Sequence, residues 1–192
     1  MIDGTFKVVK SLQLMIIGTD ASEDGIRPGT NFIMLACLFT NRKTKATYQR
    51  WFHNLSRAGL RLQSGQDGVT DMEFGISNAA SEVWPGTLWR LCWFHVKMNT
   101  REKMTELHLP ANVTVFLLKK LDEMHGQAVS SSRITWNEIS NSFRSCEVDR
   151  SDEEKKKLIL KCIKWVDYME KYYIPHLNRW CGEGSMTNNL IE

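Results

Sequence analysis

Two aspartates lie in or directly after segments that are expected to form strands, and they are the strongest candidates for catalytic or metal-binding residues. Asp3 lies within Asp3-Gly4-Thr5-Phe6, although aspartate is depleted in strands. Asp71 follows Gly68-Val69-Thr70, at the expected start of a helix. If the two strands are neighbours, the carboxylates face each other, and their mutual repulsion requires a cation. Carboxylate oxygens favour Mg²⁺ or Mn²⁺.

The acids around the second strand also have ordinary structural interpretations. Asp71 could cap the helix that follows it, because an aspartate side chain accepts hydrogen bonds from the first backbone amides of a helix. Glu73, in the expected first turn, could interact with the helix dipole. Both interpretations stay open beside the metal site, and Glu73 is kept as a secondary candidate.

Cys92 and His95 form a second candidate site, at the expected junction of a strand and a helix. A Cys and a His three residues apart are a possible pair of Zn²⁺ ligands. A structural zinc site needs four ligands, and the sequence offers no matching second pair. A positioning role beside the acidic edge, or simple packing, is the alternative that the spacing favours.

The ends of the chain give a third signal. Thr187-Asn188-Asn189-Leu190-Ile191-Glu192 has the pattern of a helix N-terminus, with caps before an apolar pair and an acid. At the other end, Met1-Ile2 gives the first strand almost no lead-in before Asp3. We therefore expect the chain to be cut at both ends.

The first half of the chain is predicted to be a mixed sheet with two helices. Three apolar runs form the opening strands, at 2–9, 12–19 and 32–39. Their short first connection favours an antiparallel meander, because parallel crossovers need a dozen or more residues. Helices and strands then alternate: a helix capped by Thr44, a strand at 68–70, a helix through 76–83 and a strand at 88–93.

The second half is predicted to contain helices only, from about residue 94 to a stop at Pro175. Ser130-Ser131-Ser132 is interpreted as a loop, and Lys155-Lys156-Lys157 as the solvated face of a helix. Two capping boxes are predicted to begin helices, at Thr135 with Glu138 and at Ser151 with Glu154.

Composition bounds the class of protein. The chain has 192 residues, with 25 Lys and Arg against 22 Asp and Glu, for a net charge of +3. This charge is too small to indicate nucleic-acid binding by itself, so such a role must be argued from a site. No apolar run approaches the roughly 20 residues that span a bilayer, and we expect no membrane partner. The 5 cysteines form no CxxC pair, and reduced, mostly buried thiols are expected.

The motifs together resemble the catalytic domain of Mutator-like element (MULE) transposases, over essentially the whole chain. The resemblance rests on the order of five short stretches: Asp3-Gly4-Thr5-Phe6-Lys7, Thr70-Asp71-Met72-Glu73-Phe74-Gly75-Ile76, Trp84-Pro85-Gly86, Cys92-Trp93-Phe94-His95 and Thr187-Asn188-Asn189-Leu190-Ile191-Glu192. It implies an α/β, ribonuclease H-like mixed sheet, a three-stranded antiparallel meander plus alternating helices and strands, with an all-helical insertion. The expected parts are a core at 1–93, the insertion at 94–180, and at 181–192 the start of a C-terminal core helix.

The resemblance also implies roles for individual residues. Asp3, Asp71 and Glu192 match the three acids of a DDE triad, which are both catalytic residues and metal ligands. Cys92 and His95 match the C-x-x-H signature, to which we assign a structural or positioning role. Asp20 is a further secondary candidate, because it is expected across the hairpin from Asp3, although turn chemistry also explains it.

The implied function is two-metal phosphodiester cleavage and strand transfer on DNA, with Mg²⁺ or Mn²⁺ as cofactor. The expected partners are transposon ends, target DNA and further copies of the chain, in the nucleus. Basic residues such as Lys7, Lys10, Arg42, Lys43 and Lys97 are candidates for phosphate contacts.

Two departures from the family leave an alternative open. A full transposase would add an N-terminal DNA-binding region and sequence beyond the third acid. Glu192, as the last residue, would lie on a frayed helix end, so little activity is expected from this chain alone. The alternative is a non-catalytic, transposon-derived module that binds DNA or protein.

Overall fold

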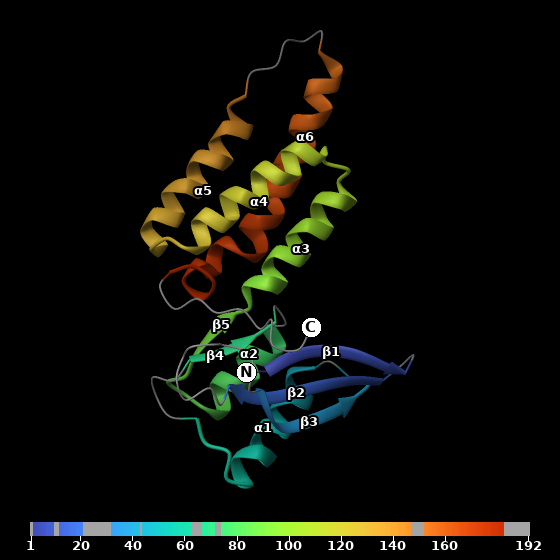
Figure 1. Ribbon diagram of the computed structural model, residues 1–192, viewed down its shortest axis with the longest axis vertical. Coiled ribbons are helices and arrows are strands. Elements are labelled where there is room, and N and C mark those ends of the chain that lie inside the picture. The colour runs from blue at the N-terminus through green and yellow to red at the C-terminus, as the bar shows by residue number, and fades with distance from the viewer. Residues whose placement is uncertain are drawn as a thin grey trace. The chain divides into compact units, whose positions relative to one another are not determined.

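The computed structural model describes most of the chain as two compact units (Figure 1). The described residues are 2–9, 12–20, 32–42, 44–62, 67–71, 74–146 and 152–182. The first unit runs up to Phe94, and the second begins at His95. None of the described helices is long and apolar enough to cross a membrane.

The first unit mixes strands and helices, and the second is helical. The first contains β1 (Ile2–Val9), β2 (Leu12–Asp20), β3 (Phe32–Thr40), α1 (Lys45–Arg57), β4 (Asp67–Thr70), α2 (Phe74–Val83) and β5 (Leu88–Leu91). Helix α3 (Trp93–Glu106) begins at the end of the first unit. The second continues with α4 (Ala111–His125), α5 (Val129–Arg144), α6 (Glu153–Tyr172) and the 3₁₀ helix η1 (Ile174–Arg179).

A 5-stranded mixed sheet organises the first unit, in the order β3-β2-β1-β4-β5. The first three strands pair antiparallel in succession. β1 then pairs in parallel with β4, and β4 pairs in parallel with β5. β2 is therefore the one strand of this sheet that runs against the others. The mixed α/β class expected from the sequence is confirmed.

Helix α1 forms where the sequence predicted it. The backbone amide of Thr47 donates to the Thr44 hydroxyl at 3.2 Å, which satisfies one of the free amides at the helix start. Tyr48, Trp51 and Phe52 are buried on one face, as their spacing predicted. Gly59 ends the helix with a positive φ of 101°, a conformation that side chains disfavour.

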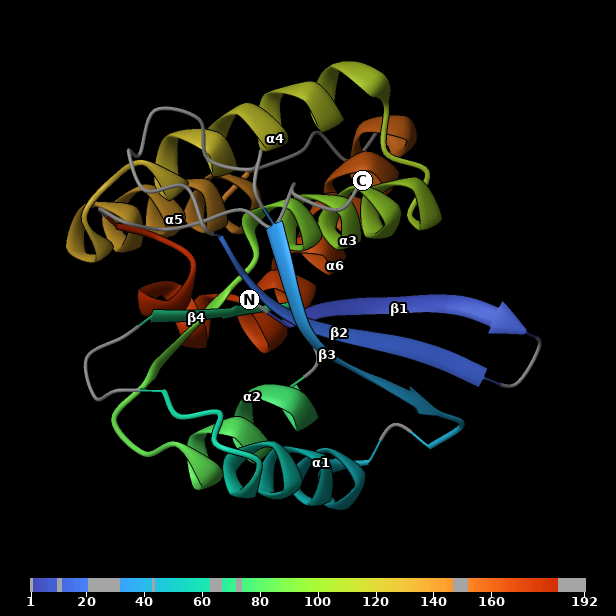
Figure 2. The same cartoon turned by 60° about the horizontal axis from the view of Figure 1, so that its bottom comes forward.

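Helices α1 and α2 lie against one face of the sheet (Figure 2). Aromatic rings connect them to the strands. The ring centroid of Phe52 in α1 lies 5.3 Å from that of Trp84, just after α2. Trp84 in turn lies 6.5 Å from Trp89 of β5. Each ring pair adds roughly 0.5–1.5 kcal/mol beyond the area it buries. The indole of Trp84 also donates to the Leu60 carbonyl at 3.3 Å, so this core ties the helices to the edge strand.

One glycine is required by this packing. Gly68 of β4 is the register partner of Trp89 on β5. A Cβ at Gly68 would lie 2.4 Å from the Trp89 ring, closer than any real contact. The indole therefore lies directly over the β4 backbone, and only glycine leaves room for it.

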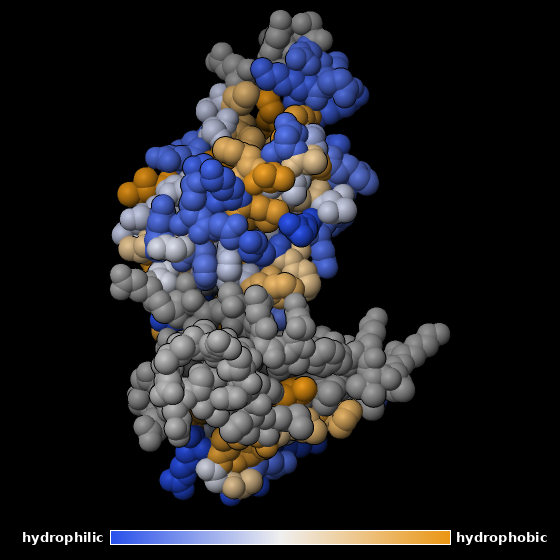
Figure 3. Space-filling model, in the orientation of Figure 1, coloured by the Kyte–Doolittle hydropathy of each residue, from blue (hydrophilic) through white to orange (hydrophobic). Residues whose placement is uncertain are grey.

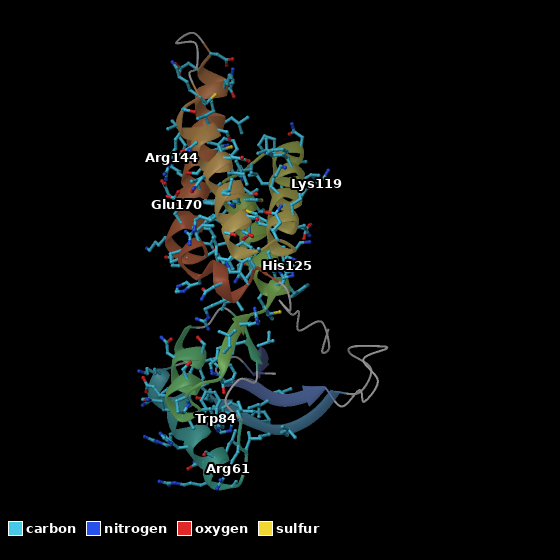
Figure 4. All side chains as sticks on the ribbon, turned by 90° about the vertical axis from the view of Figure 1, so that its left-hand side faces the viewer. Arg61, Trp84, Lys119, His125, Arg144 and Glu170 are labelled. Carbon is cyan, nitrogen blue, oxygen red and sulfur yellow. The ribbon has the colours of Figure 1, made fainter. Side chains whose placement is uncertain are left out.

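In the helical unit, the helices pack around tryptophan rings. Trp136 of α5 and Trp165 of α6 are buried, with ring centroids 5.7 Å apart. At the surface, Arg144 of α5 bonds two carboxylates of α6, Asp167 and Glu170, each at 2.8 Å (Figure 4). The α5–α6 pair is therefore joined by a ring contact inside and ion pairs outside.

The segment after η1 is attached to the end of α4. His125 Nδ1 and the Trp180 carbonyl are 2.6 Å apart, and the Gly182 amide donates to the His125 carbonyl at 3.3 Å. Burial lowers the pKa of His125. The hydrogen bond to the Trp180 carbonyl acts in the opposite direction, but its effect on the pKa is smaller. Burial also raises the pKa of the neighbouring Cys181 thiol to about 12, so this thiol is held in its neutral form.

The predicted loop at Ser130-Ser131-Ser132 is wrong, because these residues lie in the first turns of α5. The buried Ser132 hydroxyl donates to the Met124 carbonyl of α4 at 2.7 Å, so a helix satisfies it as well as a turn would. The capping box at Thr135 and Glu138 is also wrong, because both residues lie within the same helix.

Two predicted boundaries move by one or two residues. α6 is capped by Asp152, whose carboxylate accepts from the Lys155 amide at 2.9 Å, instead of by Ser151. Ser151 itself lies outside the described residues. β5 ends at Leu91, and Trp93 already belongs to α3.

The close contact of Gly68 with Trp89 predicts a stability effect. Gly68→Ala should destabilise the chain by about 1–3 kcal/mol, because the added methyl group displaces a buried ring. Gly75→Ala is the matched control, since its Cβ would make an ordinary 3.5 Å contact with Tyr48 and gain helix propensity. Urea unfolding followed by tryptophan fluorescence measures both. Equal stability of the two variants would contradict the packing described.

Candidate functional site

The register of β1 and β4 brings the two candidate aspartates to neighbouring positions. Ile2 of β1 is the parallel partner of Thr70 of β4. Asp3 and Asp71 are the residues that follow these partners, so they take the next position on adjoining strands. Neighbouring strands lie about 4.8 Å apart. For Asp3 the structure describes the backbone, and the backbone places it beside Asp71.

Asp71 stands at the end of β4 and is half-buried. Thr70, immediately before it, is fully buried, and its hydroxyl has no hydrogen-bond partner among the described residues. Helix α2 begins at Phe74, three residues beyond Asp71. Residues 72 and 73, between Asp71 and the described start of α2, lie outside the described residues, so the capping interpretation of Asp71 stays a prediction.

Cys92 directly follows β5, as Asp71 directly follows β4. Thr70 of β4 is paired with Leu91 of β5, and the Cys92 amide donates to the Thr70 carbonyl at 2.8 Å. The register therefore aligns Cys92 with Asp71 at the carboxyl ends of β4 and β5. Such edges of parallel strands are where ligands usually bind in open α/β sheets. The alignment places the start of the C-x-x-H motif beside the acidic edge.

The two residues of that motif differ in their surroundings. Cys92 is fully buried and lies between β5 and the start of α3. His95 lies in the first turn of α3 and is half-buried. A buried thiol at the end of a strand packs as a small apolar group. These surroundings fit the positioning or packing role of Cys92 better than an exposed ligand role.

The remaining predicted site residues are placed only in part. Glu73 and Glu192 lie outside the described residues. Asp20 ends β2, but the register pairs Asp3 with Ile16, so Asp20 lies four residues beyond that partner, roughly 13 Å along the strand. The prediction that Asp20 lies across the hairpin from Asp3 is therefore wrong. Two register shifts in the β1–β2 ladder account for two of these four residues, because a regular hairpin would pair Asp3 with Gly18.

The side chains that could hold a metal ion at this end of the sheet are described only in part. Among the residues whose side chains are described, no group of three His, Cys, Asp or Glu could hold a metal ion. The side chains of Asp3 and Glu192 are outside that set. What the described backbone gives is a pair of adjacent aspartate positions, and carboxylates are the ligands that Mg²⁺ and Mn²⁺ prefer.

The predicted phosphate-binding cations show different surroundings. Arg42 is exposed just after β3. Lys97 of α3 instead bonds both oxygens of Asp122 on α4, at 2.9 and 3.1 Å, which compensates its charge. Lys10 and Lys43 lie outside the described residues, and for Lys7 only the backbone is described.

Comparison with known families gives one match. The model of the MULE transposase domain matches residues 1–99, which is more than half of the chain. The matched region contains Asp3, Asp71, Cys92 and His95. No curated protein matches the chain.

The surroundings of the cysteines predict their reactivity. Cys37 and Cys146 are exposed and should react with iodoacetamide within minutes in the folded chain. Cys92, Cys162 and Cys181 are buried and should react only after denaturation. Peptide mapping by mass spectrometry, with and without EDTA, measures this. Rapid native labelling of Cys92, or labelling released by EDTA, would contradict its packing role and indicate a metal ligand.

Proposed function

Because the chain belongs to the MULE transposase domain family, we propose that it catalyses cleavage and strand transfer of DNA. The proposed site is a DDE triad of Asp3, Asp71 and Glu192. The family assignment indicates a transposase-related function and an interaction with DNA. The proposal adds a reaction type and a catalytic triad to this assignment. The pairing of β1 with β4 supports the triad, because it relates the positions of Asp3 and Asp71.

The single observation that carries this proposal is the parallel pairing of Ile2 with Thr70. It makes Asp3 and Asp71 neighbours although a meander and a helix separate them in sequence. Two carboxylates at one sheet edge repel each other unless a cation lies between them. A fold that holds them together is therefore suited to binding divalent cations.

The strand order supports a ribonuclease H-like core for this proposal. Three antiparallel strands come first, and two further strands, each preceded by a helix, add in parallel beside β1. This order of elements belongs to the mixed α/β class and supports the fold that the family resemblance implies. The helices from α3 onward then separate this core from Glu192, as an insertion before the third acid would.

In the proposed mechanism, Asp3 and Asp71 are ligands from the sheet and Glu192 is the third ligand. Held by these three residues, Mg²⁺ or Mn²⁺ would supply activation of the attacking hydroxyl and stabilisation of the leaving oxygen of the phosphodiester. The chain's own residues supply placement and negative charge. Half-burial of Asp71 limits the water around its carboxylate, which strengthens its attraction for a cation.

The parallel strands and α3 supply the rigid support. Thr70 is paired to Leu91, and the Cys92 amide bonds the Thr70 carbonyl, so the end of β4 is fixed just before Asp71. Cys92 is fully buried beside this junction. A fixed ligand position reduces the reorganisation that binding and catalysis would otherwise need.

The test is nicking of supercoiled plasmid DNA by the whole chain in Mn²⁺. We expect slow nicking that disappears in EDTA. Asp71→Ala should lower the rate by about 100-fold or more, comparable to the loss of one transition-state contact. Glu82→Gln is the matched control, an exposed acid on α2 that pairs with Lys45, and should nick like the unaltered chain.

Two outcomes would contradict the proposal. One is nicking of equal rate in Asp71→Ala, which would identify a contaminating nuclease or another site. The other is no Mn²⁺-dependent nicking by a chain that circular dichroism shows to be folded. Either result would leave the family assignment in place and remove the catalytic role.

A further inference from the structure

An open groove runs along α6 in the helical unit. One hollow of about 700 Å³ lies between the first half of α6 and the segment after α3, around His108 and Pro110. A second, of about 450 Å³, lies between the second half of α6 and the end of α3. Lys164 lines both hollows, and the two hollows together are called here the α6 groove. Figure 3 shows hydrophilic side chains gathered over the first turns of α6.

Lysines line this groove at a helical repeat. Lys157, Lys161, Lys164 and Lys171 of α6 are spaced by four, three and seven residues, which places them on one face of the helix. Tyr168 stands on the same face between the last two. At about 1.5 Å per residue, the stripe is roughly 21 Å long.

Contacts hold two of these cations at the groove without neutralising them. Lys161 donates to the His108 carbonyl at 3.3 Å. Lys171 Nζ lies 4.9 Å from the ring centroid of Tyr172. Cation–π contacts and a carbonyl bond reduce the motion of a lysine but leave its positive charge.

The carboxylates that line the groove are engaged elsewhere or with other lysines. Asp167 bonds Arg144 on α5. Glu106 bonds Lys103, and Glu154 bonds Lys157. In the described part of the chain, no carboxylate is within ion-pair distance of the remaining stripe lysines: Lys161, Lys164 and Lys171. Asp152 also lines the groove, and its carboxylate accepts a hydrogen bond from the Lys155 backbone amide. The uncompensated positive charge is therefore confined to the stretch from Lys161 to Lys171, beside aromatic rings.

We propose that the α6 groove binds the phosphate backbone of duplex DNA. The proposal rests on the proposed function, which makes DNA the substrate, and adds the surface that holds it. A stripe of roughly 21 Å faces about six base-pair steps of 3.4 Å along one strand. Lysines contact phosphates as point charges, so the groove fixes the position of the duplex without reading its sequence.

The charge of the groove favours duplex DNA as its partner over an apolar ligand. The unpaired cations lie along the groove at a spacing that a regular polyanion can match. The groove is open, which suits a duplex that lies across a surface better than a buried side chain.

The experiment measures binding of the whole chain to a fluorescent 30-base-pair duplex in EDTA, so that no metal contributes. The plot of log affinity against log salt should lose about 0.9 of slope per phosphate contact removed. We compare the unaltered chain with a triple variant that carries Lys161→Gln, Lys164→Gln and Lys171→Gln. The slope of the triple variant should be smaller by roughly 2.7, and by the same amount on duplexes of unrelated sequence.

Lys119→Gln is the control. Lys119 is exposed on α4 of the same helical unit and does not line the groove (Figure 4). Its removal should leave the slope within about 0.5 of the starting value, since it makes no predicted phosphate contact. Circular dichroism of each variant establishes that the helices are intact before binding is compared.

A triple variant whose salt slope and affinity match those of Lys119→Gln would overturn the proposal. So would tighter binding of polyglutamate, or of single-stranded RNA, than of the duplex. Failure here is distinguishable from failure of the proposed function. The duplex binding in EDTA tests the groove alone, whereas the Mn²⁺-dependent nicking, compared between the unaltered chain and Asp71→Ala, tests the catalytic site alone.

Discussion

The structure depends on one pairing, in which the start of β1 lies parallel to the end of β4. Through it the antiparallel meander and the parallel half become a single sheet, and Asp3 comes to lie beside Asp71. The pairing is maintained from the far side of β4, where the Trp89 ring covers Gly68 and the Cys92 amide bonds the Thr70 carbonyl. The aromatic core of α1, α2 and β5 thus stabilises the strand pairing on which the proposed site depends.

The two units supply the complementary parts of one proposed task. The sheet edge offers carboxylates, which would attract divalent cations but repel DNA. The helical unit offers the lysines of the α6 groove, which attract the phosphate backbone. Mixed charge of this kind leaves a net charge of only +3, so composition alone hides both features. A protein can therefore act on nucleic acid with an almost neutral composition when its charges are segregated by the fold.

Local sequence signals predicted the first unit well because each element carries its own physical cue. The Thr44 cap, the buried ring positions of α1 and the alternation of strands and helices needed no long-range information. The errors arose where tertiary contacts decide. Ser132 is helical because a carbonyl of α4 accepts its hydroxyl hydrogen, and Asp20 is displaced because bulges in the hairpin shift its register. A regular two-residue hairpin would pair Asp3 with Gly18, whereas the observed partner is Ile16. Lys161, Lys164 and Lys171 belong to none of the motifs in the sequence, because the groove that they line forms only where α6 lies beside α3 and the segment after it.

The most direct measurement of the central claim is the Mn²⁺ affinity of four chains by isothermal titration calorimetry: unaltered, Asp3→Asn, Asp71→Asn and the double variant. If adjoining strands place both carboxylates on the same cations, each single variant should lose most of the affinity. The double variant should then lose little more, since the site is already broken. Losses that simply add, or a single variant that binds Mn²⁺ like the unaltered chain, would show that the two aspartates do not share a site.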